Sequence, residues 1–522
     1  MKMVKSLMLG SAAGLLVMGG AQAADLPLKA KAVEYVKVCS LYGAGFWYIP
    51  GTDTCIYIGG AVRLDVGINS ATYDAPYWQN GATPSAGASQ AFGKNWFSNR
   101  ERLNLTEDTR TATEYGVLRT YANLQLDWIS SGSSGIAGGQ PVEVDFAFIQ
   151  FAGFTMGKAV SEYDPQWALT KPIISSGFFN GSNDATGIPQ LAYTATFGNG
   201  VSATISLEDS QPYRTAGVVN TSAATLNGLI QSTPGASLYG VGGFTGNAVA
   251  GDHVPDVVGN LRLDQAWGTL HFAAAAHEVH GTYYGTGLAA DPLVSGNGKP
   301  DSTYGFAATA AIELKNLPTG AGDSIKAEVG YAHGAAKYVW GGTVDTDGAG
   351  RFFRASGTQG GTLAFGYVLD GIYTGTGTAA TDTNISLSNA WEFSGFYEHY
   401  WNPQWRTSVF GNYSAISYGA GAGAALLGAL NNGAGFGILA TNGNANYASA
   451  QVGTKTSWQP VKNLTFSGEF IYSRLIPSTT GTFTNTGAAG APGAVSGAPA
   501  GAVYNIGAQN IFQGAFQVLR SF

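Results

Sequence analysis

Charged side chains are scarce in this chain of 522 residues. Asp, Glu, Lys and Arg together make up 11% of it, whereas soluble proteins usually contain about 25%. The formal net charge of −7 provides no basic surface for nucleic acid, so we expect no nucleic-acid partner. The shortage of charge argues against an ordinary water-facing surface and favours a surface that faces lipid.

Long hydrophobic runs are also lacking after the first 23 residues, so no later segment reads as a membrane-spanning helix. Residues 1–23 combine a basic start, an apolar core from 7 to 18 and the small-residue site Ala-Gln-Ala at 21–23. This pattern predicts a bacterial secretory signal peptide cleaved after Ala23, with a retained amphipathic anchor as the alternative. The mature chain would then lie in an oxidising compartment, where disulfides persist.

Cysteine occurs only twice, at Cys39 and Cys55, which are 16 positions apart. A disulfide between them would close a short loop and stabilise the fold by about 3 kcal/mol in the chain-entropy model. Two thiols without a nearby pair of His or Cys residues make half of a zinc ligand set. The C-x-x-C spacing of redox-active pairs is absent as well. We therefore predict a structural disulfide and no metal or other cofactor.

Glycine and aromatic residues are plentiful, with 76 glycines and 12% aromatics, and the segments between glycine-rich stretches have a period of two. In residues 117–128, Leu118, Leu124 and Trp128 alternate with polar residues such as Arg119. Residues 56–68 alternate in the same way. A helix would not gather the polar residues of either segment on one side, so both read as strands with an apolar face and a polar face. This is the pattern of a membrane β-barrel.

The connections between the predicted strands fall into two length classes. Seven are tight and eight are long and rich in small residues, which gives sixteen strands, with fourteen or eighteen as alternatives if boundaries shift. The tight turns are expected near 108–113, 152–154, 197–200, 264–268, 315–323, 401–405 and 458–463. We predict an all-β, 16-stranded antiparallel transmembrane β-barrel over residues 56–522, wide enough for an aqueous channel.

The ends of the mature chain carry a family resemblance. The stretch EYVKVCSLYGAGFWYIPGTDTCIYIGGAVRLDV at 34–66 resembles the N-terminal signature of the rhizobial and Brucella-type porins of alphaproteobacteria. The final residue, Phe522, lies in phase with Phe512, Phe516 and Val518, as in the C-terminal strand that outer-membrane assembly machinery recognises, although Arg520 departs from that pattern.

The resemblance implies a bacterial outer-membrane protein surrounded by lipid and lipopolysaccharide. It also implies a homotrimer of sixteen-stranded barrels, each an aqueous channel for passive diffusion of small hydrophilic solutes. Residues 24–55 precede the first strand, so we expect them at the periplasmic side, where the disulfide would fasten the chain as it enters the barrel. The rival interpretation places this segment in the lumen as a partial plug.

In the porin architecture the third long loop folds inward after the fifth strand, here the strand at 154–160. The acids of that loop are Glu162, Asp164 and Asp184. Polar-phase arginines on three consecutive strands would line the facing wall. These arginines are Arg63, Arg100, Arg102 and Arg119. Opposed acids and arginines would set up a transverse field that governs ion selectivity. The alternative is that the arginines form structural salt bridges with Asp65, Asp127 and Glu143.

Other functions have little support in the sequence. The segment AHEVH at 276–280 lacks the His spacing of H-E-x-x-H and lies in a predicted strand, so we interpret it as barrel wall. No nucleophile–base constellation stands out, and we predict that the protein is not an enzyme. A substrate-selective channel, for example for sugars, and a surface-binding adhesin barrel remain the alternatives to a general diffusion porin.

Overall fold

The computed structural model describes residues 37–69, 97–130, 137–139, 142–175, 177–178, 180–181, 186–209, 216–222, 248–284, 298–341, 351–356, 361–377, 379–432, 438–484 and 501–522. Within these residues a single large sheet has 18 strands, and two of them, β1 (Trp47–Tyr48) and β5 (Ala137–Gly139), are short additions. The other sixteen form a closed antiparallel barrel, as predicted. They are β2 (Cys55–Ile68), β3 (Phe97–Thr113), β4 (Gly116–Ser130), β6 (Glu143–Phe151), β7 (Phe154–Ala159), β8 (Ile188–Gly198), β9 (Val201–Glu208), β11 (Asp256–Gln265), β12 (Gly268–Val279), β13 (Thr303–Lys315), β14 (Ser324–His333), β19 (Asn389–Asn402), β20 (Trp405–Ser417), β22 (Tyr447–Val461), β23 (Leu464–Pro477) and β26 (Gln509–Ser521).

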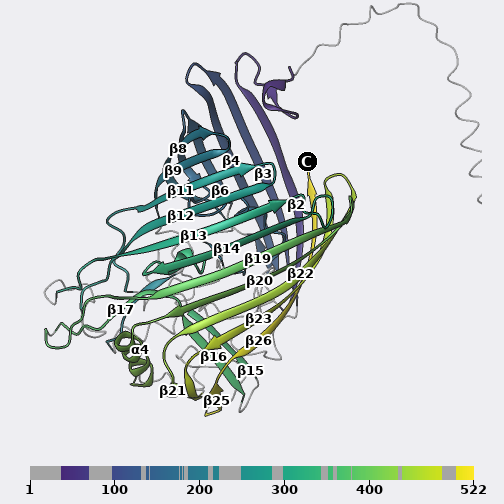
Figure 1. Ribbon diagram of the computed structural model, residues 1–522. Helices are drawn as coiled ribbons and strands as arrows, with labels where there is room; N and C mark the ends of the chain where they lie inside the picture. The colour runs from purple at the N-terminus through teal and green to yellow at the C-terminus, as the bar shows by residue number, and fades with distance from the viewer. Residues whose placement is uncertain are drawn as a thin grey trace, which may run out of the picture.

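The barrel closes because its first strand pairs with its last. Strand β2 pairs with β26 from Ala61↔Ser521 to Ile68↔Gly514, and every other barrel strand pairs with its neighbours along the chain. The strands run obliquely around the barrel in Figure 1. Closure leaves no barrel strand with an open edge, which is what a sheet in hydrocarbon requires because lipid offers no hydrogen bonds to the backbone.

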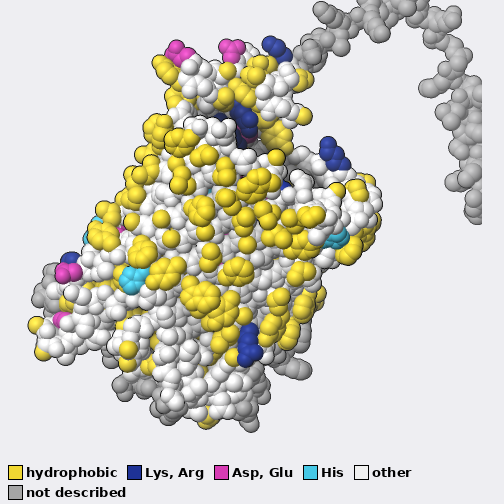
Figure 2. All heavy atoms as spheres, viewed as in Figure 1, with side chains coloured by type: hydrophobic (Ala, Val, Ile, Leu, Met, Phe, Trp, Pro, Cys, Tyr) yellow, Lys and Arg dark blue, Asp and Glu magenta, His cyan; other side chains and the backbone are white. Residues whose placement is uncertain are grey.

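Side-chain alternation divides the wall into an outer and an inner face. On β12, Phe272 is 54% exposed whereas His271 is 2% exposed, and the same alternation runs along the other strands. The outer face is apolar, and Figure 2 shows hydrophobic side chains spread over it with few charges among them. The stacked pair Trp405 and Trp458 lies beside two of the short turns, where aromatic residues suit the membrane–water boundary.

The seven tight connections all join neighbouring barrel strands. Asn199 (φ 52°) and Gly200 (φ 78°) form the turn between β8 and β9, a conformation that Asn and Gly tolerate best. Six turns lie where the sequence predicts them. The first does not, because β3 continues to Thr113 and the turn is at 114–115. The β-branched residues at 109, 111 and 113 extend this strand through the segment that we expected to be a turn.

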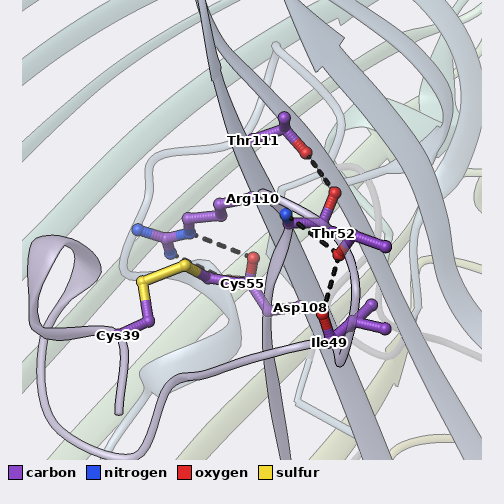
Figure 3. The surroundings of a disulfide bond; sticks show 8 residues. Cys39, Ile49, Thr52, Cys55, Asp108, Arg110 and Thr111 are labelled. Atoms are coloured by element: carbon purple, nitrogen blue, oxygen red, sulfur yellow. Dashed lines mark hydrogen bonds and ion pairs between the residues drawn. A yellow bond between two sulfur atoms is a disulfide. The ribbon is translucent and has the colours of Figure 1, made fainter. Parts of the chain in front are cut away.

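The two cysteines form the predicted disulfide, Cys39–Cys55. Figure 3 shows it joining the segment before the barrel to the first residue of β2. Cys39, Cys55 and Phe46 are buried together, and Arg110 of β3 lies over the ring of Phe46 at 4.9 Å. The C terminus lies at the same end of the barrel (Figure 1), where the backbones of Phe522 and Gly60 exchange two hydrogen bonds.

The long connections at the opposite end contain structure of their own. Parallel and antiparallel pairing joins β10 (Gly217–Asn220), β17 (Leu369–Tyr373) and β18 (Ser386–Leu387). A five-stranded sheet contains β15 (Arg351–Ser356), β16 (Thr362–Tyr367), β25 (Val503–Ile506), β24 (Thr480–Thr484) and β21 (Ile438–Asn442). The helix α4 (Ala420–Asn432) lies near β17 in Figure 1. Among the described helices, none has the length and hydropathy of a membrane span.

Candidate pore lining

The connection between β7 and β8, residues 160–187, contacts inward-facing side chains of many barrel strands. Near its start, the carboxylate of Glu208 on β9 accepts hydrogen bonds from the Ser161 hydroxyl (2.7 Å) and the Glu162 backbone (2.9 Å). Asn260 on β11 donates to the Glu162 carboxylate at 2.9 Å. The imidazole of His271 on β12 lies 2.9 Å from the Tyr163 carbonyl oxygen. The segment is therefore held against this part of the wall from inside the barrel.

The middle of the same segment is bound to strands much later in the chain. Glu469 on β23 accepts backbone hydrogen bonds from Ile174 (2.5 Å) and Ser175 (2.9 Å), and Gln451 on β22 donates to the carbonyl of Gly177 at 2.8 Å. Contacts to β9 at one end and β23 at the other mean that the 160–187 segment crosses the lumen.

Two aromatic side chains of the segment are buried where it crosses. Trp167 packs edge-on against Phe396 of β19, with ring centroids 5.9 Å apart. Phe178 lies 5.3 Å from Phe396 and 5.5 Å from Phe410 of β20. Burying these rings stabilises one path of the segment across the lumen, since each aromatic side chain removes a large apolar area from water.

The predicted arginine wall is present on β2, β3 and β4. Asp65, which is 0% exposed, is its first anchor. Its carboxylate accepts a hydrogen bond from Nε of Arg63 at 2.7 Å and two from Arg100 at 2.9 and 2.6 Å. Gln517 of β26 donates a further one at 2.9 Å. A carboxylate with four donors around it holds both arginine side chains in fixed positions.

Two further aspartates hold the remaining arginines of this wall. Arg102 binds Asp127 through two hydrogen bonds of 2.7 and 2.6 Å. Asp108 accepts from both Arg110 and Arg119, with Nη2–Oδ2 distances of 2.8 and 2.9 Å. Around Asp65 and around Asp108, two guanidinium groups therefore share one carboxylate.

The structure brings the four predicted arginines together on one wall but does not bring them into contact with the predicted acids. Glu162 binds Asn260 on a different part of the barrel, and Asp164 is buried at 5% exposure. Asp184 lies outside the described residues. The salt-bridge alternative named Asp65 and Asp127 correctly, whereas Glu143 accepts a hydrogen bond from Gln125.

Asp108 and Arg110 are not among the predicted site residues, because the sequence predicts a turn at 108–113 where β3 in fact continues to Thr113. Both lie in the inward phase of β3 together with Arg100 and Arg102. Extending the alternation by three more residues, to position 110, finds both.

A closed β-barrel with an apolar outer face, a charged inner wall and a segment crossing its lumen defines the class of outer-membrane channel proteins. The comparisons with known proteins agree with this class. The family model described as "Porin subfamily" matches residues 25–514, and the chain belongs to this porin family. The resemblance to the Brucella-type porins inferred from the sequence is thereby confirmed, as is the location in the outer membrane.

Individual relatives match only part of the chain. Porin Omp2b of Brucella suis biovar 1 (strain 1330) is 32% identical over 286 residues, which cover 53% of this chain and 66% of that porin. Porin Omp2b of Brucella melitensis biotype 1 (strain 16M) is 33% identical over 289 residues, with the same coverage. The matched part thus spans about two thirds of these relatives. The crystal structure of the outer membrane channel DcaP of Acinetobacter baumannii shares the fold, with a TM-score of 0.50, 12% identity, and coverage of 91% of this chain and 99% of that one.

Proposed function

We propose that the barrel is a water-filled channel for passive diffusion of small hydrophilic solutes and ions, and not an enzyme. The observation that carries this proposal is the lumen itself, which has a charged wall on β2–β4 and is crossed by the 160–187 segment. Solutes would pass between the segment and the wall. The measurement is single-channel conductance in planar bilayers, where a diffusion channel gives a large current that is proportional to salt concentration.

The arginine wall would set the ion preference of this channel. Arginines outnumber aspartates on the inner face of β2–β4, and this composition would favour anions over cations. The arginines are Arg63, Arg100, Arg102, Arg110 and Arg119, and the aspartates are Asp65, Asp108 and Asp127. The role proposed for Glu162 and Asp164 is to shape the opposite side of the path, with Asp184 as the third acid of the segment.

Arg119 provides the sharpest test of the ion preference. Its side chain is 26% exposed, and Arg110 still binds Asp108 when Arg119 is replaced. Arg119→Gln should therefore shift the reversal potential towards cations without unfolding the barrel. Arg262→Gln removes the same charge from another part of the inner face, where Arg262 binds Asp264, and should have a smaller effect. Equal shifts in the two variants, or none in either, would contradict a local role for the arginine wall.

A solute-selective channel is the second candidate, and one observation favours it. The long connections contribute Trp340, Phe365 and Leu369 to a buried apolar cluster that also includes strand residues Tyr447 and Ile511. Loops that pack this firmly at the mouth would restrict which solutes enter. Saturable block of the current by one solute would support selectivity, whereas linear flux of unrelated small solutes would support general diffusion.

We further propose a homotrimer. It is supported by the family resemblance and by two carboxylates on the outer face of β3, Glu101 and Glu107, which are exposed in the single chain. Carboxylates facing lipid are unfavourable, so a neighbouring copy would cover them better than hydrocarbon. Native mass spectrometry in detergent tests this proposal, and a monomeric mass at all concentrations would count against it.

A further inference from the structure

Three metal-ligating side chains meet at the end of β11 and β12 that carries the long connections. His253 lies three residues before β11, Glu278 is near the end of β12, and His280 follows that strand. One ligand atom from each residue lies within 4.8 Å of the other two. The imidazole rings of His253 and His280 are 4.1 Å apart at their centroids. Within the part of the chain that the structure describes, no other three His, Cys, Asp or Glu residues come this close.

The three side chains are held in place by their own hydrogen bonds. Oε2 of Glu278 accepts from the backbone N–H groups of His253 (2.7 Å) and Val254 (3.2 Å), while Oε1 lies 3.5 Å from Nδ1 of His253. Nδ1 of His280 is 2.6 Å from the hydroxyl oxygen of Ser302. A partner on one ring nitrogen orients an imidazole and directs the other nitrogen towards a ligand, as in protein metal sites.

We propose that His253, Glu278 and His280 bind a divalent transition-metal ion of the zinc type. Two imidazole nitrogens and one carboxylate oxygen suit Zn²⁺, with water as the fourth ligand. Tetrahedral Zn²⁺ with bonds of about 2.0–2.2 Å needs ligand atoms about 3.4 Å apart. The ligand atoms must therefore move closer together when the ion binds. The His253 side chain can make this movement because it is 62% exposed, whereas that of Glu278 is 4% exposed.

His277, the other histidine of the segment AHEVH at 276–280, is not part of this site. His277 lies on the inner face of β12, 2.7 Å from a carboxylate oxygen of Asp256 and 3.5 Å from one of Asp370. Glu278 lies on the opposite, outer face because strand side chains alternate, and His280, just after the strand, has its ring 4.1 Å from that of His253. The site is thus outside the lumen, and a bound ion should leave channel conductance unchanged. Lys299 and Asp252 are close enough to act electrostatically on His280, with opposite signs.

Titration of the chelator-treated, folded protein in detergent with Zn²⁺ tests the proposal. The wild-type chain should bind one Zn²⁺, and His253→Ala and His280→Ala should each weaken binding at least tenfold. His333→Gln is the matched control, since His333 lies at the same end of the barrel on β14 and binds Asn389. Unheated gel mobility verifies that each variant is folded, and the exposed His253 can be replaced without opening the core.

Electron paramagnetic resonance with Cu²⁺ as the probe gives an independent readout of the ligands. The wild-type chain should show splitting from two nitrogens and His253→Ala from one. The proposal is overturned if the wild-type chain takes up no Zn²⁺, or if His253→Ala binds it as tightly as His333→Gln. It is also overturned if His253→Ala and His333→Gln give the same Cu²⁺ spectrum.

Discussion

Replacing Arg100 or Asp65 should destabilise the barrel strongly, because these side chains form a buried ion pair. Arg100 is 1% and Asp65 0% exposed, and their closest nitrogen–oxygen distance is 2.6 Å. Unit charges about 4 Å apart interact by about 4 kcal/mol at an effective dielectric constant of about 20. Removing one partner of a buried pair typically costs about 3–5 kcal/mol. We expect Arg100→Gln to cost about 3 kcal/mol, near the lower end of this range, because Arg63 and Gln517 still bind Asp65.

Asp65→Asn should cost more, about 5 kcal/mol, since two guanidinium groups then lose the carboxylate that they share. The double variant should cost less than the sum of the single variants, with a coupling of about 1–3 kcal/mol. Urea-induced unfolding of the barrel in detergent micelles, followed by tryptophan fluorescence, measures these free energies. Asp264→Asn is the control, because Asp264 is 42% exposed in its pair with Arg262 and such pairs are worth about 0–1 kcal/mol. Two results would refute the reasoning. One is a double variant whose loss of unfolding free energy equals the sum of the losses in the two single variants. The other is an Asp65→Asn loss no larger than that of Asp264→Asn.

Three further predictions concern the ends of the barrel. Burial raises the pKa of Asp323, but hydrogen bonds from Thr319, His399, Tyr400 and Tyr397 outweigh it and hold this pKa well below its usual range. Its contribution to stability is therefore present above the unfolded pKa of about 4 and is lost as pH falls towards the folded value. Asp323→Asn should be less stable than wild type at pH 7, and a stability difference that does not shrink in acid would contradict this. Replacing Cys39 and Cys55 by serine should leave the barrel folded but expose residues 40–54 to protease, and equal cleavage with and without the disulfide would count against its fastening role. Cysteine at Ala380 should react with impermeant reagents on intact cells and cysteine at Gln404 should not, and the reverse pattern would invert the topology.

The barrel could be predicted from the sequence because its signals are local. Alternation places the side chain of Arg119 on the inner face without knowledge of any partner strand, and an Asn-Gly pair such as Asn199-Gly200 marks a turn by its backbone preference alone. Counting such turns is enough to obtain the strand number. The error at β3 has the same origin, since Asp108 was read as a turn residue by its type although the flanking residues favour a strand.

The contacts made by the predicted site residues could not be predicted from local sequence patterns. Glu162 contacts Asn260, almost a hundred positions later in the chain, and this contact depends on the path of the whole 160–187 segment. The metal-ligand cluster shows the same limit. The sequence predicts AHEVH at 276–280 to be barrel wall because the third ligand, His253, lies 25 positions before Glu278 and no local spacing links the two.

The pairing of β2 with β26 has a consequence for biogenesis. The first strand pairs with β3 on one side but finds its second partner only in the last strand, from Gly514 to Ser521. An incomplete chain therefore exposes two unpaired edges however many strands it has already formed. Inserting such a chain into hydrocarbon would leave backbone groups without hydrogen bonds, at a cost of several kcal/mol for each group. Assembly of this protein is therefore all-or-none with respect to its C-terminal strand, and a chain shortened by that one strand should be retained in the periplasm for degradation.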